Sequence, residues 1–201
     1  MEIIERTSGI VSTCSYVVKD NGKVYLVDAP DDNKEIISLI EKEGRLDGVF
    51  LTHGHFDHIM GLENIYHLFP NAPIYLDSSD LDLVKSKNLI FLKNFGIPTS
   101  LYNIPKEIKF TQYPEKIGSF TVINTPGHTM GSVVLYAKDY SVAFSGDTLF
   151  CAGEGRTDLG GDYISLVSSL KKILHTLDEN TLLYPGHGGY TTIKREKERL
   201  F

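Results

Sequence analysis

The chain is poor in cysteine, in long apolar stretches and in net positive charge, and each deficit argues against a class of protein. Only two of its 201 residues are cysteines, Cys14 and Cys151, which make no disulfide framework and suit a reducing compartment. No apolar run approaches the roughly 20 residues of a membrane span. Residues 1–5 lack the basic start and apolar stretch of a secretory signal. We therefore expect a cytoplasmic protein with no membrane partner.

Acidic residues outnumber basic ones in this chain. Lys and Arg total 20 against 26 Asp and Glu, which gives a formal net charge of −6. Electrostatic binding of nucleic acid needs clustered positive charge, so no nucleic-acid partner is expected. The 41% hydrophobic and 23% charged fractions are those of an ordinary globular protein. With no linker-like stretch, we expect a single domain over residues 1–201 and a small-molecule substrate, whereas the oligomeric state is left open.

Strand and helix signals run through the chain twice. Strands are predicted at residues 15–18, 24–27, 48–51, 74–76, 120–123, 133–136, 142–144 and 182–184. Helices are predicted at residues 33–43, 62–69, 162–177 and from about 192. Asn21-Gly22 supplies the positive φ that a tight hairpin turn needs. Strands followed by a helix, twice over, predict two similar half-units in a layered α/β core.

Residues 78–106 are less regular and predict short helices and loops. The expected buried anchors of this segment are Leu81, Leu83, Leu89, Ile90 and Phe91. Two roles are open for it: a structural excursion without chemistry, or a lid that covers a substrate.

Histidines and aspartates gather at the ends of the predicted strands. Three histidines and an aspartate lie within residues 53–58, directly after the strand at 48–51. His128 and His187 each follow a short strand in a Pro-Gly-His step, and Asp147 follows another strand. Glycine lets the backbone turn sharply at such a point, and ligand sites in α/β sheets commonly lie outside strand ends. We therefore expect these side chains to meet in one crevice.

Burying so many titratable groups is costly unless a metal ion compensates them. Neutral imidazole and carboxylate suit zinc or iron. Seven ligands are too many for one tetrahedral ion, whereas two metals that share a bridging carboxylate fit the count. The expected cofactors are two divalent ions per chain, chiefly zinc, with iron or a mixed iron–zinc pair as alternatives. The predicted ligands are His53, His55, Asp57, His58, His128, Asp147 and His187.

The segment from His53 to His58 matches the H-x-H-x-D-H signature, and the chain resembles the metallo-β-lactamase fold superfamily over essentially its whole length. The resemblance implies an α/β fold, specifically a four-layer αββα sandwich with the metals at one edge of the paired sheets. It also implies a division of the ligands: His53, His55 and His128 on one metal, Asp57, His58 and His187 on the other, and Asp147 between them.

Residues 125–129 and 145–150 look most like the hydroxyacylglutathione hydrolase, or glyoxalase II-like, branch. Full-length members of that branch carry a further helical domain that grips glutathione. Because this chain stops one helix beyond His187, the resemblance implies either a smaller thioester or glutathione binding without that domain. Pro30 is a departure from this resemblance, because relatives usually have glycine near this position. Asp28 beside it could orient a ligand or serve only as a turn residue.

Two metal ions would make a bound water acidic enough to supply hydroxide, which attacks an acyl carbonyl without a serine or cysteine nucleophile. The resulting hypothesis is a thioesterase for glutathione-type or other small acyl thioesters. Asp147, as the bridge, and Asp57, as a ligand that could share the water proton, are the candidate catalytic residues. Arg156 is predicted to bind a substrate carboxylate, with a salt bridge to Asp158 as the alternative. Tyr190 is a candidate pocket residue, with a packed loop position as its alternative.

The alternative function is a mononuclear iron persulfide dioxygenase of the same superfamily. Such relatives resemble this chain at residues 155–158 and retain the other histidines without filling a second site. Metal content separates the two hypotheses. His67 and His175 lie outside the motifs and are expected to be structural or exposed.

Overall fold

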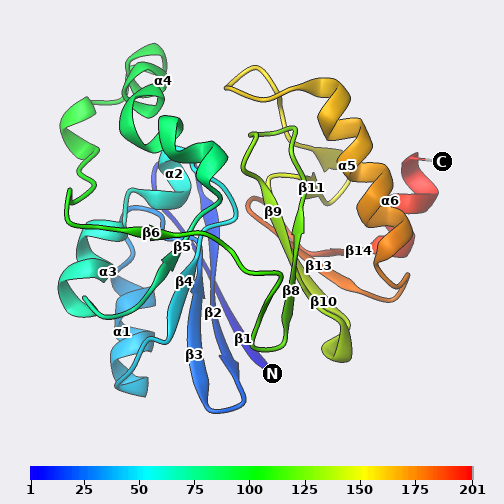
Figure 1. Ribbon diagram of the computed structural model, residues 1–201, viewed down its shortest axis with the longest axis horizontal. Coiled ribbons are helices and arrows are strands. Elements are labelled where there is room, and N and C mark those ends of the chain that lie inside the picture. Colours follow the sequence, from blue (N-terminus) through cyan, green and yellow to red (C-terminus); the bar gives the residue numbers. More distant parts are fainter. Residues whose placement is uncertain (201) are drawn as a thin grey trace. The chain divides into compact units, whose positions relative to one another are not determined.

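The computed structural model describes residues 1–200 and contains two compact units, one formed by residues 1–112 and one by the residues from 113 onward (Figure 1). Each unit contains a six-stranded sheet. Two similar half-units, each with strands and helices, were expected from the order of elements. The single domain over residues 1–201 stays a prediction.

The sheet of the first unit is mixed, with strand order β1-β2-β3-β4-β5-β6. Its strands are β1 (Glu2–Ser8), β2 (Thr13–Asp20), β3 (Lys23–Val27), β4 (Gly48–Phe50), β5 (Ile74–Tyr75) and β6 (Phe110–Thr111). β1, β2 and β3 are antiparallel neighbours, and the pairs from β3 to β6 are parallel. The predicted turn between β2 and β3 is confirmed, with φ of 49° at Asn21 and 76° at Gly22. β1 and β6 had no prediction.

Helices cover one face of this first sheet (Figure 1). They are α1 (Lys34–Glu43) and α3 (Leu62–Leu68), with the short α2 (Phe56–Ile59) before α3. α1 ends where predicted, because Gly44 adopts the left-handed conformation with φ of 68°. Ile36 and Ile40 of α1 pack with Leu26 and Val49 of the sheet in a buried apolar cluster. That cluster gives the unit its own core.

The segment at residues 78–106 is helical in short pieces, as expected. It contains the 3₁₀ helices η1 (Ser78–Asp80) and η3 (Thr99–Leu101), the π-helix η2 (Leu83–Lys87) and α4 (Asn88–Asn94). Two of the predicted anchors are wrong: Leu89 and Ile90 are 36% and 57% exposed. A single short helix buries only one face, and α4 uses that face for Asn88 and Leu92.

The sheet of the second unit has strand order β14-β13-β10-β9-β8-β7. Its strands are β7 (Lys116–Ile117), β8 (Phe120–Asn124), β9 (Val133–Ala137), β10 (Val142–Gly146), β13 (Leu182–Pro185) and β14 (Thr191–Thr192). Only β10 and β13 pair in parallel. A separate two-stranded ribbon, β11 (Leu149–Phe150) and β12 (Gly153–Glu154), follows β10. The 3₁₀ helix η4 (Lys138–Tyr140) connects β9 and β10.

Two helices cover one face of the second sheet, α5 (Tyr163–Thr176) and α6 (Ile193–Leu200) (Figure 1). α5 begins at the predicted position, because the Asp162 carboxylate accepts a hydrogen bond of 2.7 Å from the Ser165 N–H. Leu166 and Ile173 of α5 pack with sheet residues in the apolar core of this unit.

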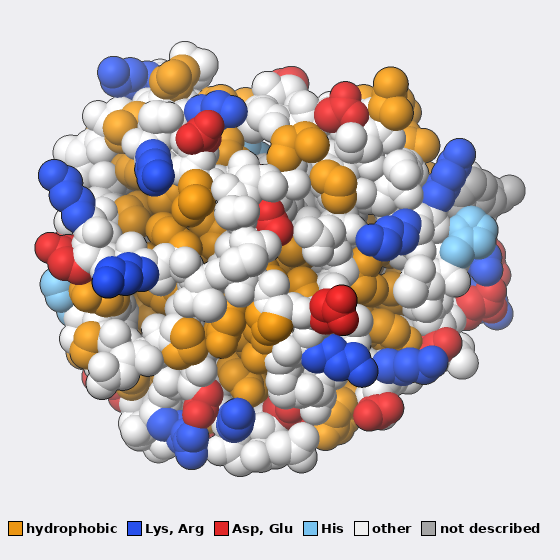
Figure 2. Space-filling view, viewed as in Figure 1, with side chains coloured by type: hydrophobic (Ala, Val, Ile, Leu, Met, Phe, Trp, Pro, Cys, Tyr) orange, Lys and Arg blue, Asp and Glu red, His pale blue; other side chains and the backbone are white. Residues whose placement is uncertain are grey.

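Figure 2 shows Lys and Arg side chains interspersed with Asp and Glu side chains on the face that it draws. Within residues 1–200, no helix has both the length and the apolar character that a membrane crossing needs.

Candidate functional site

The H-x-H-x-D-H segment lies in the first unit, where β4 ends and α2 begins. β4 stops at Phe50, an irregular stretch carries His53 and His55, and α2 carries Asp57 and His58. All four predicted ligands are buried. The structure therefore places them on one short loop and the single helical turn that follows it.

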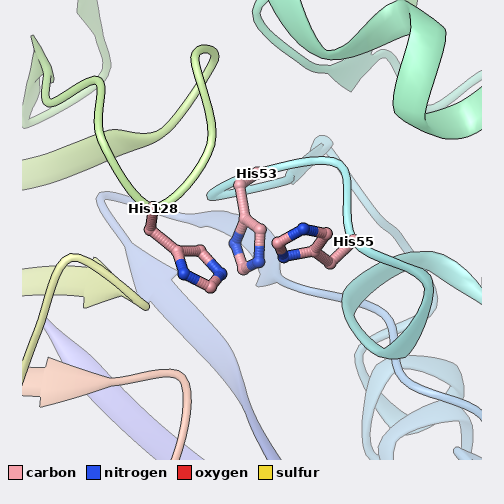
Figure 3. A group of neighbouring side chains, drawn as sticks. All are labelled: His53, His55 and His128. Carbon is pink, nitrogen blue, oxygen red and sulfur yellow. The ribbon is translucent and has the colours of Figure 1, made fainter. Parts of the chain in front are cut away.

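His53 lies against each of the other two histidines of this segment. The rings of His53 and His55 are 4.9 Å apart, centroid to centroid, and perpendicular (Figure 3). The rings of His53 and His58 are 4.1 Å apart. His53 and His58 each offer a ligand atom within 4.8 Å of the other, as do Asp57 and His58. Four candidate ligands of the first unit thus form a compact set.

Asp28 orients this set from the end of β3. Its carboxylate accepts hydrogen bonds from the Thr52 N–H at 2.8 Å and from the Thr52 hydroxyl at 2.7 Å. The same carboxylate lies 2.8 Å from Nδ1 of His58. Of the two roles open to Asp28, orienting a candidate ligand is the one that these contacts support. Its left-handed backbone, with φ of 57°, turns the side chain into this position.

The loop around Pro30, where the family resemblance leads us to expect glycine, is held by backbone hydrogen bonds. The Ala29 N–H donates to the His58 carbonyl at 2.8 Å, and the Gly61 N–H donates to the Ala29 carbonyl at 2.8 Å. An added Cβ on Gly61 would lie 2.1 Å from the Pro30 carbonyl oxygen. Glycine at position 61 therefore lets the loop approach α2 closely.

The donor chemistry of the first set fits a bound cation. An ionised Asp28 can only accept, so Nδ1 of His58 carries the hydrogen and Nε2 presents a lone pair. That Nε2 lies 3.3 Å from Oδ2 of Asp57, which also accepts from the Thr13 hydroxyl at 2.9 Å. A lone pair and a carboxylate at this distance repel unless positive charge joins them. A metal ion or a second proton on His58 supplies that charge.

The second unit holds the remaining predicted ligands at the ends of three strands. His128 follows β8, Asp147 follows β10 and His187 follows β13. Oδ2 of Asp147 lies 3.5 Å from Nε2 of His128 and 3.5 Å from Nε2 of His187. One carboxylate oxygen is thus equidistant from two imidazole nitrogens, a position suited to a bridge.

A backbone carbonyl sets the tautomer of His128. Nδ1 of His128 lies 2.7 Å from the Arg156 carbonyl oxygen, which can only accept. Nδ1 therefore carries the hydrogen, and Nε2 turns its lone pair toward Asp147. This is the arrangement that a metal-ligating histidine commonly has. Sequence reasoning had linked Arg156 to substrate and did not foresee the role of its carbonyl.

Gly155 was also missed as a site residue. A Cβ added there would lie 2.0 Å from the Asp147 carbonyl oxygen and 2.9 Å from Nδ1 of His128. The backbone after β12 can approach both candidate ligands only because residue 155 has no side chain. A glycine directly before Arg156 was the available signal, but glycine alone does not reveal what it packs against.

The two predicted substrate residues lie on the surface of the second unit. The Arg156 guanidinium forms a bidentate pair with Asp158, with both nitrogen–oxygen distances 2.6 Å. This is the salt bridge that the sequence left as the alternative. The hydrogen bonds from Arg156 lower the pKa of Asp158 to about 2. Tyr190 is 63% exposed, and its ring centroid lies 6.2 Å from that of Tyr184 on β13. Substrate binding by either residue stays a prediction.

The last two histidines are exposed, as expected. His67 lies on α3, and His175 lies on α5, where its Nδ1 is 2.6 Å from the Lys171 carbonyl oxygen. Neither belongs to a candidate ligand set.

Comparison with known proteins identifies the class to which this fold and these ligand sets belong, that of the metal-dependent hydrolases. A family model described as the metallo-beta-lactamase superfamily matches residues 9–187. The chain belongs to this superfamily and is one of its metallo-hydrolases. The predicted fold class, the αββα sandwich of the metallo-β-lactamase fold, is thereby confirmed.

Two curated relatives match nearly the whole chain. It is 32% identical to a probable metallo-hydrolase of Streptococcus pyogenes, over 98% of this chain and 88% of the relative. It is also 32% identical to the hydroxyacylglutathione hydrolase GloC of Haemophilus influenzae, over 98% of this chain and 94% of the relative. The resemblance to the hydroxyacylglutathione hydrolase branch is confirmed at this level of similarity.

Two solved structures share the fold over nearly their full lengths. The protein TTHA1623, solved in a di-iron-bound form, superposes with a TM-score of 0.86 at 29% identity, covering 96% of each chain. The BLEG-1 B3 metallo-beta-lactamase superposes with a TM-score of 0.83 at 33% identity, covering 98% of this chain and 97% of that one.

Proposed function

We propose that this protein is a dinuclear metal-dependent hydrolase of glutathione-type or other small acyl thioesters. The observation that carries the proposal is the pairing of imidazole lone pairs with carboxylate oxygens in both units, at Asp57–His58 and around Asp147. The thioester substrate is supported by the 32% identity to a hydroxyacylglutathione hydrolase.

The proposed ligands divide between the ions as the family resemblance implies. His53, His55 and His128 would hold one ion, Asp57, His58 and His187 would hold the other, and Asp147 would bridge them. A pair of divalent ions supplies, when bound, a water acidic enough to act as hydroxide near neutral pH. Zinc is proposed for both positions, although the di-iron form of TTHA1623 makes iron an equally direct test.

The protein's own groups prepare the ligands. Asp28 holds the hydrogen of His58 on Nδ1, and the Arg156 carbonyl does the same for His128. The Thr13 hydroxyl donates a hydrogen bond to Oδ2 of Asp57, and this bond orients the carboxylate. Asp57 is proposed to share the proton of the attacking water through a hydrogen bond, in addition to serving as a ligand. These contacts exist before any substrate arrives, so little reorganisation is needed during the reaction.

Arg156 is proposed to bind a substrate carboxylate, which would replace the Asp158 carboxylate on the Arg156 guanidinium. Both side chains of the pair are more than half exposed, and exposed ion pairs contribute little free energy. A substrate carboxylate can therefore replace Asp158 at small cost. Tyr190 is exposed and follows His187 closely in the sequence. It is proposed to line the substrate pocket.

The first experiment measures metal content and thioester cleavage on protein prepared without a chelating step. We expect about two metal ions per chain and metal-dependent release of free thiol from lactoyl- or acetyl-glutathione. His128→Ala should abolish thiol release, whereas His175→Ala, which removes an exposed histidine of the same unit, should leave it unchanged. A broad panel of acyl thioesters without metal-dependent thiol release would contradict the proposal.

The same preparation distinguishes the competing activities. One iron per chain, with oxygen consumption on glutathione persulfide, would favour the persulfide dioxygenase. Faster turnover of a β-lactam than of any thioester would instead align the chain with the lactamase that it matches at 33% identity.

A further inference from the structure

The segment at residues 78–106 reaches the backbone between two predicted metal ligands. Gly54 separates His53 from His55, and a Cβ added to it would lie 2.9 Å from Cβ of Asp80 and 3.2 Å from the Asp80 carbonyl oxygen. Glycine is required at position 54 because η1 packs directly against the backbone there.

Asp80 holds the N–H side of this glycine. Its Oδ2 accepts a hydrogen bond of 2.8 Å from the Gly54 N–H, and the residue is fully buried. η1 is itself anchored, because Asp77 accepts from the Ser79 N–H at 2.9 Å and from the Gln112 side chain at 2.8 Å. Gln112 directly follows β6, so the position of Asp80 is tied to the edge strand of the sheet.

Asn88 holds the carbonyl side of the same glycine. Its Nδ2 donates to the Gly54 carbonyl at 2.9 Å and to the Tyr102 hydroxyl at 3.0 Å. The Tyr102 hydroxyl donates onward to the Val84 carbonyl at 2.7 Å. Burial raises the pKa of Tyr102 to about 12, so the hydroxyl keeps this proton near neutral pH. Both partners of the Asn88 amide therefore need a donor, which fixes its orientation.

We propose that Asp80 and Asn88 are positioning residues for His53 and His55, which makes residues 78–106 a support of the ligand loop. They fix the peptide groups on both sides of Gly54, and the orientation of those peptides determines the directions in which the two imidazoles project. Small errors in ligand direction weaken a metal site. This inference rests on the proposed function, because it concerns ligands of the proposed metals.

The test compares Asn88→Asp and Asp80→Ala with matched surface variants. Asn88→Asp keeps size and shape but replaces the donor that faces the Gly54 carbonyl with an acceptor. Asn94→Asp on the same helix and Asp82→Ala beside η2 alter exposed side chains and serve as controls. The readouts are Co²⁺ affinity by chelator competition, the visible spectrum of bound Co²⁺, and hydrogen exchange at the Gly54 amide of metal-free protein.

We expect Asn88→Asp and Asp80→Ala to weaken Co²⁺ binding by about 10–100-fold and to alter its spectrum. Asp80→Ala should also accelerate hydrogen exchange of the Gly54 amide. Asp80→Asn retains one acceptor oxygen and should therefore keep most of the Co²⁺ affinity of the unaltered chain. Where a variant fails to fold, the milder Asp80→Asn and Tyr102→Phe are measured in its place and should show smaller shifts of the same kind.

Affinities and spectra equal to those of the unaltered chain would overturn the positioning role. Metal binding without thioester cleavage would overturn the proposed function and leave the positioning role standing. An unaltered chain that binds no metal would overturn both.

Discussion

At the residue scale, the buried side chain of Asp28 orients both Thr52 and the candidate ligand His58. It is 1% exposed and accepts three hydrogen bonds, from the N–H and hydroxyl of Thr52 and from Nδ1 of His58. Through these bonds the end of β3 orients the segment that follows β4. Acceptor-only partners of this kind hold a histidine in the tautomer that a metal requires.

Asp28→Asn is predicted to weaken metal binding by about 10–100-fold. Asparagine tolerates the same left-handed backbone, but its amide turns donors toward groups that also donate. Chelator competition on the purified variant measures the affinity. Asp32→Asn, which alters an exposed residue that also has positive φ, should match the unaltered chain. Equal affinities in both variants would remove Asp28 from the site.

At the scale of elements, strand ends bring the candidate ligands of each unit together. β8, β10 and β13 are all in the second sheet, and each is followed by one predicted ligand. The antiparallel strands β11 and β12 then reverse the direction of the chain. Gly155, directly after β12, therefore packs against His128 and Asp147. The ribbon had no prediction, because two-residue strands leave almost no pattern in a sequence.

Gly155→Ala is predicted to destabilise the protein by about 1–3 kcal/mol, the usual cost of overpacking. The added methyl group would overlap the Asp147 carbonyl, 2.0 Å away, and should also reduce metal retention. Gly153→Ala in the same ribbon is the matched control, since its nearest neighbour, Cδ2 of Phe150, is 3.9 Å away. Thermal unfolding of both variants measures the destabilisation. Equal unfolding midpoints for Gly155→Ala and Gly153→Ala would contradict the prediction.

At the scale of the whole molecule, one buried carboxylate joins elements that are separate in the sequence. Glu196 of α6 is fully buried and accepts hydrogen bonds from the Thr191 hydroxyl, the Arg199 side chain and the Ala152 N–H. Burial raises the pKa of Glu196, but these donors outweigh it, so its pKa lies below the usual value. One carboxylate thereby joins α6, β14 and the turn between β11 and β12.

Because the pKa of Glu196 is lowered by folding, its stabilisation is complete above the unfolded pKa and is lost as pH falls through the folded one. Glu196→Gln is therefore predicted to lower stability by about 1–3 kcal/mol near neutral pH. It should also flatten the decline in the melting temperature below about pH 5. Thermal scans of metal-free protein across pH test this, with Glu198→Gln on the exposed side of α6 as the control. Parallel pH profiles for the unaltered chain and Glu196→Gln would contradict the prediction.

Much of the fold was predictable because its elements carry local signals. Asn21-Gly22, Gly44 and Asp162 mark a turn, a helix end and a helix start that the structure confirms. Strands β1 and β6 lacked such signals, and Leu89 and Ile90 were wrongly assigned to the core. Their apolar character satisfied the pattern, but burial depends on which neighbours a short helix meets.

By itself, the sequence determined the family, the fold class and the candidate ligands. The histidines, aspartates and glycines that identify them lie in short motifs after strands, and the spacing within such motifs is visible without the tertiary structure. The tertiary structure decided which groups hold those ligands. Asp28, the Arg156 carbonyl, Asp80 and Asn88 reach their partners from 24 to 34 positions away in the chain. Hydrogen bonds of this kind depend on how separate elements pack, and no local pattern encodes that packing.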